Sequence, residues 1–166
     1  MKKIYLAGGC FWGVQHFARQ LKGITNTVVG YANSAKINPS YEEVKSNQTN
    51  AAETVEITYN ETEITLNEIL KLYFMIIDPE SIDRQGEDIG HQYRTGIYYI
   101  DDKDVSIINQ ELETLRNTHK VINIEIKKLE NFYKAEEYHQ DYLLKNPDGY
   151  CHVSKDLIEF AKKYKQ

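Results

Sequence analysis

The order of strand-like and helix-like patterns along the chain constrains its fold more than any other sequence feature. The clearest element is a helix that follows Thr65, because Thr65 and Glu68 form a capping box and apolar residues recur at helical spacing up to Ile77. Strict apolar–polar alternation over 53–59 predicts the strand before it. The other patterns predict strands at 3–7, 27–32, 93–100 and 124–129, and helices after Cys10, at 102–118, at 135–145 and after Ser154. Strands and helices do not alternate regularly in this order, so we expect an α+β fold with a mixed central sheet and flanking helices.

The remaining segments predict connections within one unit. Residues 33–50 and 78–92 are polar and read as loops, the first with one helical turn at 41–44. We expect residues 1–166 to form a single domain, because a chain of 166 residues that is 41% hydrophobic can bury a core without disulfides or metals. The first six elements predict a ferredoxin-like βαββαβ core, and the turn at 146–149 predicts a long coil near the C-terminus.

Charge and hydropathy exclude several classes of partner. The net charge is −5 and Lys and Arg are scattered, so the sequence predicts no basic surface for nucleic acid or an anionic membrane. The most apolar stretch, 69–77, is far shorter than the roughly 20 residues that cross a bilayer, and 4–7 is too short for the apolar region of an export signal. Two cysteines in a chain of this length favour a reducing compartment, and we expect a cytoplasmic monomer with a small or neutral ligand.

The motif GGCFWG at 8–13 holds the first candidate site. Cys10 follows a strand and precedes a helix, so helix N–H groups and the helix dipole are expected to lower the pKa of its thiol and make it a nucleophile. Phe11 and Trp12 point about 100° apart on a helix and cannot share one narrow core stripe. The alternative is a buried, inert Cys10 that packs as a small hydrophobe.

Glu53 is the second candidate, because strand parity places it on the apolar face with Val55, Ile57 and Tyr59. If that face packs inward, desolvation raises the pKa of Glu53 and keeps it protonated near neutral pH, as a general acid requires. The alternative is that Glu53 lies at the exposed end of the strand and is simply solvated.

Other polar residues carry weaker signals. Tyr31 and Tyr93 lie on strand faces where packing is the alternative to a site role, and Asp88 lies in a charged, glycine-containing loop that reads equally as a solvated turn. His139 could pair with a thiolate or serve as a structural hydrogen-bonding residue. Cys151 adjoins a histidine but lacks the spacing of a zinc site, so we expect no metal.

Several segments together resemble a known family. The chain is similar to the A-type peptide methionine sulfoxide reductases in GGCFWG, VGYANSAKINPSYEEV, AAETVEITY, DRQGEDIGHQYRTGIYY, AEEYHQDYL and NPDGYC. The resemblance runs from about Ile4 to His152, and GCFWG is a highly specific motif. It implies reduction of methionine-S-sulfoxide by thiols, with no bound cofactor and with an external dithiol such as thioredoxin as the reductant.

The resemblance also implies a role for each candidate residue. Cys10 would be the nucleophile and Cys151, in the GYC motif, the resolving cysteine. Phe11 and Trp12 would hold the S-methyl group, and His139 is similar to a histidine near the family's site. The residues implied to bind or protonate the sulfoxide oxygen are Tyr31, Glu53, Asp88 and Tyr93.

Two positions depart from the family pattern. Many members have Cys-Ser-Gly where this chain has Lys45-Ser46-Asn47, and many have a histidine in place of Ala51. Neither position is needed for the expected chemistry. Some members also have a third cysteine near the C-terminus, whereas this sequence has only Cys10 and Cys151.

The residue types fit the chemistry of sulfoxide reduction. The sulfur is electrophilic and its oxygen is a poor leaving group, so the reaction needs one nucleophile and one acid. The sulfenic acid formed on Cys10 would condense with Cys151 to a disulfide. Two rival functions are a non-catalytic aromatic cage for a methylated ammonium group, which leaves both cysteines unexplained, and a thiol peroxidase, which does not need an aromatic wall.

Overall fold

The computed structural model describes residues 1–165 and has a six-stranded sheet as its centre. The strands lie in the order β7-β6-β1-β3-β2-β8; β6 and β7 are parallel, and all other neighbours are antiparallel. Their bounds are Lys2–Ala7 (β1), Ile24–Ala32 (β2), Ala52–Tyr59 (β3), Gly96–Tyr99 (β6), Glu125–Lys128 (β7) and Phe132–Lys134 (β8). A separate hairpin pairs β4 (Arg84–Gln85) with β5 (Asp88–Ile89).

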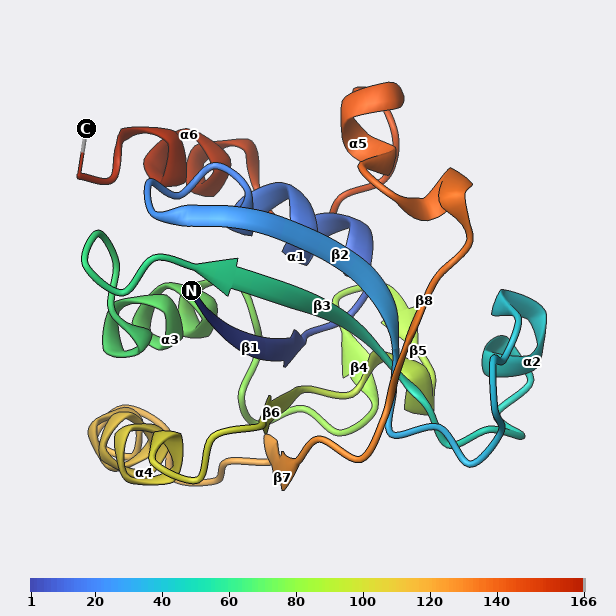
Figure 1. The fold of residues 1–166 in the computed structure, drawn as a ribbon, viewed down its shortest axis with the longest axis horizontal. Coiled ribbons are helices and arrows are strands. Elements are labelled where there is room, and N and C mark those ends of the chain that lie inside the picture. The colour runs from blue at the N-terminus through green and yellow to red at the C-terminus, as the bar shows by residue number, and fades with distance from the viewer. Residues whose placement is uncertain (166) are drawn as a thin grey trace.

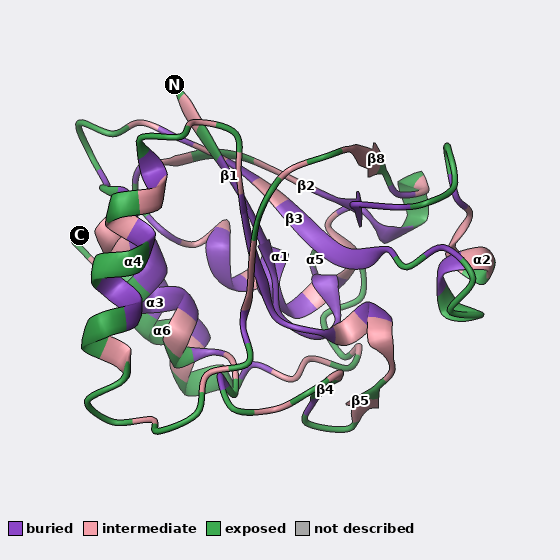
Figure 2. Ribbon diagram, turned by 90° about the horizontal axis from the view of Figure 1, so that it is seen from below, coloured by how far each residue is buried: buried purple, intermediate pink, exposed green. Residues whose placement is uncertain are grey.

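Helices surround this sheet unevenly. The α-helices are α1 (Phe11–Ala18), α2 (Tyr41–Lys45), α3 (Leu66–Met75), α4 (Asp104–Leu115), α5 (Tyr142–Lys145) and α6 (Lys155–Lys163), and the short 3-10 helices are η1 (His91–Tyr93) and η2 (Glu137–His139). Helices α3, α4 and α6 gather at one end of the molecule, and α2 lies at the opposite end (Figures 1 and 2). None of the helices in residues 1–165 has the length and apolar composition needed to cross a membrane.

The expected α+β class with a mixed sheet is confirmed. The strands of the predicted βαββαβ core, β1, β2, β3 and β6, lie in the order β6-β1-β3-β2. The ferredoxin-like description of this core stays a prediction. So does the assignment of residues 1–166 to a single domain.

Local sequence signals set the helix starts. The Thr65 hydroxyl accepts from the Glu68 backbone N–H at 3.2 Å, and the Glu68 carboxylate accepts from the Thr65 N–H at 3.1 Å, which completes the predicted capping box. Ser154 caps α6 in the same way, because its hydroxyl accepts from the Leu157 N–H at 3.2 Å.

Two predicted elements are wrong in detail. The strand expected at 93–100 begins only at Gly96, because Tyr93 is the last residue of the 3-10 helix η1. The Arg94 side chain donates to the His91 carbonyl at 3.0 Å and stabilises this helical turn. The helix expected at 135–145 is interrupted at Gln140 and Asp141. The Gln140 side chain bonds to both backbone groups of Val29, and Asp141 has a positive φ of 52°. The Gln140 amide thus takes over the role of a neighbouring strand along part of β2.

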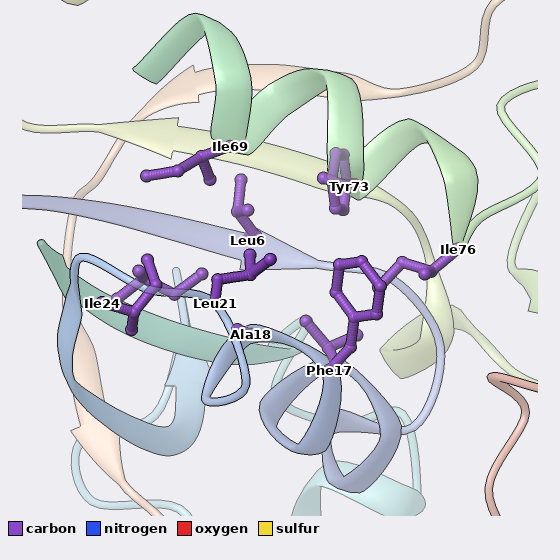
Figure 3. A pocket seen from close by; sticks show the side chains of 10 residues that line it. Leu6, Phe17, Ala18, Leu21, Ile24, Ile69, Tyr73 and Ile76 are labelled. Atoms are coloured by element: carbon purple, nitrogen blue, oxygen red, sulfur yellow. The ribbon is translucent and has the colours of Figure 1, made fainter. Parts of the chain in front are cut away.

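The main core lies between the sheet and helices α1 and α3. Phe17 and Leu21 from the α1 side and Ile69 and Tyr73 from α3 converge on Leu6 of β1 (Figure 3). The void left among them is only about 10 Å³ and is lined by apolar side chains. A space of that size barely admits one water molecule, so this core is packing and not a ligand site.

Candidate active site

Cys10 lies at the junction of β1 and α1, as predicted. It is the N-cap of α1 with an extended backbone, and its side chain caps no helix N–H. Gly9 before it has a positive φ of 81°, and a Cβ there would come within 2.7 Å of Gln85. Glycine therefore permits both the turn and the close approach of the β4–β5 hairpin.

The expected direction of the Cys10 pKa shift is wrong. The thiol is only 9% exposed, and burial together with the Glu53 carboxylate raises its pKa well above the ordinary value. The nearby backbone N–H of Trp12 lowers the pKa in part but does not reverse this shift. Desolvation of a sulfur anion at this depth outweighs the favourable field of a short helix.

Glu53 is buried at the same place. It is 1% exposed, and its two carboxylate oxygens accept from the Phe11 backbone N–H and the Gln92 side-chain amide, each at 3.3 Å. Burial raises its pKa to about 8, against the effect of these two donors. The solvated alternative is therefore excluded, and Glu53 holds a proton at neutral pH beside the residue that follows Cys10.

The β4–β5 hairpin brings Asp88 to the same thiol. Burial raises the pKa of Asp88, while the nearby backbone N–H of Cys10 lowers it. One buried carboxylate oxygen, Oδ2, has no hydrogen-bond partner within residues 1–165. The charge of Asp88 in turn raises the pKa of both Cys10 and Glu53, so the three groups form one coupled cluster.

Two tyrosines, Tyr41 and Tyr93, lie near the Cys10–Glu53–Asp88 cluster. The two hydroxyls lie close enough for each to shift the pKa of the other. Burial raises the pKa of each, and the charges of Glu53 and Cys10 raise both further. Two protonated phenols therefore lie beside a protonated carboxyl group and a thiol, which is a set of hydrogen-bond donors for a strongly accepting oxygen.

Tyr31 is not a free member of this group. It is fully buried and lies directly opposite Glu53 in the β2–β3 pairing, but its hydroxyl donates to the Glu136 carboxylate at 2.8 Å. The prediction that Tyr31 donates to the substrate oxygen is corrected on this ground, because its only hydroxyl proton is already engaged.

An aromatic cluster adjoins Cys10 and consists of Phe11, Trp12, Tyr41, His139 and Tyr142. Trp12 stacks on Tyr142 with ring centroids 3.7 Å apart, and its indole N–H donates to Nδ1 of His139 at 3.0 Å. The His139 ring lies 5.2 Å from the Phe11 ring and 4.7 Å from the Tyr41 ring. Phe11 and Trp12 thus belong to one apolar wall although they point in different directions on α1.

The His139 ring is hydrogen-bonded to Trp12 and not to a cysteine thiol within the described residues. It is 2% exposed, and burial lowers its pKa, so the imidazole is neutral at pH 7. Because Nδ1 accepts from Trp12, the ring proton is assigned to Nε2, which has no hydrogen-bond partner in the described part of the chain. Of the two alternatives left open by the sequence, this geometry favours the hydrogen-bonding role.

Cys151 lies in the coil between α5 and α6 and returns to the start of α1. Its Sγ lies 3.4 Å from the point that a Gly13 Cβ would occupy, and the His152 ring lies 2.9 Å from the same point. Gly13 is one helical turn from Cys10, whose carbonyl accepts its N–H at 3.3 Å. Both cysteines are free thiols, and burial raises the pKa of Cys151.

A groove of about 520 Å³ opens beside Cys151, between α1, α5 and α6. The second cysteine is therefore reachable from outside while Cys10 is nearly enclosed. Residues 1–165 contain no group of three or more His, Cys, Asp or Glu side chains that could hold a metal ion.

Three residues that the sequence analysis did not single out belong to the site: Tyr41, Gln92 and Tyr142. Tyr41 follows Ser40, the N-cap of α2, within the segment PSYEEV that supports the resemblance, so its position in a helical turn was a usable signal. Gln92 and Tyr142 reach the site only through the folding of η1 and the coil before α5. Helical spacing from His139 is the one sequence signal for Tyr142, and no periodicity marks Gln92.

Comparison with known proteins gives one consistent result. Residues 2–166 match the family model described as peptide methionine sulfoxide reductase. The chain is 54% identical over 157 residues to the peptide methionine sulfoxide reductase MsrA of Mycoplasma genitalium, covering 94% of this chain and 100% of that protein.

Solved structures agree with the sequence comparison. The fold is similar to the crystal structure of Mxr1 from Saccharomyces cerevisiae in reduced form, with a TM-score of 0.87, 39% identity, and coverage of 92% of this chain and 91% of that one. It is also similar to Mxr1 in complex with Trx2, with a TM-score of 0.61, 29% identity, and coverage of 85% and 84%.

Proposed function

The chain belongs to the peptide methionine sulfoxide reductase family, and from this premise we propose which residues reduce the sulfoxide and how the enzyme is recycled. It is a thiol-dependent oxidoreductase that converts methionine sulfoxide to methionine. The observation that carries the site assignment is the burial of the Cys10 thiol beside a carboxyl group whose pKa is about 8.

In the first step, Cys10 attacks the sulfoxide sulfur while Glu53 gives its proton to the oxygen. Because burial keeps both groups protonated at neutral pH, the thiol proton can refill Glu53 as the new sulfur–sulfur bond forms. The net result is transfer of one proton from thiol to oxygen. The hydroxyl group then passes from the substrate sulfur to the Cys10 sulfur while the sulfur–sulfur bond breaks, so the thioether leaves and Cys10 becomes a sulfenic acid.

Tyr41 and Tyr93 are proposed as the hydroxyl donors to the sulfoxide oxygen. Burial and the nearby Glu53 raise the pKa of both phenols, so both stay protonated in that environment. Donors held in place before the substrate arrives stabilise charge on the oxygen without reorganising during the reaction. Asp88 is proposed to add to the coupled charge cluster that keeps Glu53 and Cys10 protonated.

Phe11 and Trp12 are proposed to hold the S-methyl group. Trp12 is fixed on both sides, by stacking on Tyr142 and by its hydrogen bond to His139, so it presents a fixed apolar surface. Fixing the methyl group and the oxygen at once leaves room for one sulfur epimer. We infer from the family that this is the S epimer.

Cys151 is proposed as the resolving cysteine. Its thiol displaces water from the Cys10 sulfenic acid and forms a Cys10–Cys151 disulfide, which thioredoxin or another dithiol reduces by thiol–disulfide exchange. Two facts support this, the position of Cys151 against Gly13 and the groove beside it. We infer a monomer in the reducing cytoplasm that uses no bound cofactor.

One assay tests the function. The purified chain is incubated with racemic methionine sulfoxide and dithiothreitol, and the remaining epimers are separated. Loss of the S epimer alone is expected; consumption of the R epimer, or of neither, would contradict the proposal.

The same preparation separates the rival functions. Hydrogen peroxide consumption in place of sulfoxide would indicate a thiol peroxidase, and binding of trimethyl-lysine peptides would indicate an aromatic cage. We expect neither at a rate or affinity comparable with sulfoxide reduction.

A further inference from the structure

Glu136 joins three segments that meet at the site but has no place in the proposed reaction. It precedes η2 and is half-buried. One carboxylate oxygen accepts from the Tyr31 hydroxyl at 2.8 Å, and the other accepts from the Tyr41 backbone N–H at 2.9 Å. The carboxylate therefore ties the end of β2 to the first residue of α2.

The second of these hydrogen bonds adds to the Ser40–Glu43 capping box at the start of the short helix α2. The first N–H groups of a helix have no partner within it, and α2 spans only Tyr41–Lys45. It lies at the end of the molecule opposite α3, α4 and α6 (Figures 1 and 2), and apart from Val44 its side chains are not fully buried. The capping box engages the backbone N–H groups of Ser40 and Glu43, and Glu136 supplies the acceptor for the Tyr41 N–H between them.

The charge on Glu136 makes that bond a strong one. Desolvation favours the neutral form, but the Tyr41 N–H and the Tyr31 hydroxyl outweigh it and lower the pKa of Glu136. Hydrogen bonds to an ionised acceptor are roughly twice as strong as neutral ones. The two donors bond to different oxygens of Glu136, and an amide in its place has an oxygen at only one of these two positions.

The Tyr41 side chain carries this placement into the site. Its ring packs against His139, three residues after Glu136, with ring centroids 4.7 Å apart, and its hydroxyl is near enough to Tyr93 and Glu53 for both to shift its pKa. We propose that Glu136 is a positioning residue. By bonding to the Tyr41 backbone, its carboxylate holds the Tyr41 hydroxyl at the sulfoxide oxygen, and Tyr31 supports the site by bonding to the same carboxylate. This inference rests on the proposed role of Tyr41 in sulfoxide reduction.

The test is a double-mutant cycle on Glu136 and Tyr41. Single-turnover reduction of methionine sulfoxide is measured for wild type, Glu136→Gln, Tyr41→Phe and the double variant, with folding checked by thermal unfolding. We expect Glu136→Gln to slow the step about tenfold in the wild-type background and less than about twofold in Tyr41→Phe, because residues that act through one another are not additive. A merely structural role would give the same loss in both backgrounds.

Glu137→Gln is the matched control. It removes the adjacent negative charge, but the Glu137 side chain is 80% exposed and lies 3.6 Å from Lys134 on the surface. Its rate should stay within about twofold of wild type in both backgrounds.

Two results would overturn the proposal: a Glu136→Gln rate close to wild type, or equal losses with and without the Tyr41 hydroxyl. A Tyr41→Phe rate equal to wild type would refute the role of Tyr41 as well as that of Glu136. If Glu136→Gln does not fold, the same cycle is run with Glu136→Asp, which keeps the charge but is too short to reach both donors.

Discussion

Tyr31 and Glu53 face each other across β2 and β3, yet their polar groups serve different ends of the site. Glu53 accepts from the Phe11 N–H at 3.3 Å, beside Cys10, whereas the Tyr31 hydroxyl reaches away to Glu136 at 2.8 Å. Two residues that are paired in neighbouring strands can therefore have different hydrogen-bond partners and different roles. Groups that touch the reacting atoms and groups that support them should therefore respond differently to substitution.

Replacing the nucleophile should abolish the reaction. Cys10→Ser leaves a hydroxyl that is far less acidic than a thiol and cannot form the sulfenic acid. Methionine formation is measured with dithiothreitol in excess. Measurable turnover in this variant would refute the assignment of Cys10.

Replacing the resolving cysteine should separate the two halves of the cycle. Cys151→Ser should still form about one equivalent of methionine per enzyme but should lose turnover supported by thioredoxin. A burst measurement without reductant and a steady-state assay with thioredoxin give the two values. Undiminished steady-state turnover would mean that another thiol resolves Cys10.

Removing the acid should slow the sulfoxide step and change its pH dependence. The pKa of Glu53 is about 8, so the wild-type single-turnover rate should fall as pH rises through that value and Glu53 loses its proton. Single turnover by Glu53→Gln should be slower by about 100-fold. Its rate should not fall as pH rises through about 8, since Gln has no proton to give.

The control for this variant lies on the same strand. Glu56 points to the other face of the sheet and accepts from the Tyr5 hydroxyl at 2.9 Å. Glu56→Gln should keep the wild-type rate and pH profile. A Glu53→Gln rate equal to that of Glu56→Gln would exclude Glu53 as the acid.

The raised pKa of Glu53 also predicts a stability change. Its folded-state pKa, about 8, lies above the ordinary 4.5, so the folded chain retains a proton that the unfolded chain releases as pH rises. The wild-type protein therefore loses stability between these two values. Glu53→Gln should be more stable than wild type by on the order of 1–3 kcal/mol near pH 7.5, with the gain vanishing near pH 4.

Thermal unfolding of both proteins across this pH range gives the measurement. Glu87→Gln, an exposed carboxylate in the β4–β5 turn, controls for the loss of one charge. A difference between Glu53→Gln and wild type that does not change with pH would contradict the buried proton.

The two tyrosines should behave differently. Tyr41→Phe removes a hydroxyl beside Glu53 and should slow single turnover about tenfold or more. Tyr31→Phe removes one of two donors to Glu136 while the Tyr41 N–H remains, so its rate should stay within about threefold of wild type. The opposite order of effects would restore the original prediction for Tyr31.

Much of this protein follows from local patterns in its sequence. The capping residues of α3 and α6, the strand 53–59 and the inward side of Glu53 could all be predicted, because hydrogen bonds between near neighbours and the alternation of a strand depend on adjacent residues. The motif GGCFWG likewise placed Cys10 at a strand-to-helix junction.

Other features depend on contacts between residues far apart in the chain. The Cys10 thiol has a raised pKa and not a lowered one, because the sheet buries it against Glu53. Tyr31 and Tyr41 differ in role because of Glu136, about a hundred residues further along the chain. Its carboxylate accepts from the hydroxyl of Tyr31 but from the backbone N–H of Tyr41, so the Tyr41 hydroxyl is not bonded to Glu136. The sequence determined the fold class and predicted Cys10 as the nucleophile and Glu53 as the acid. Only the tertiary structure decided the charge state of the thiol and which tyrosine is free to donate, since both depend on desolvation and on hydrogen-bond partners that chain packing supplies.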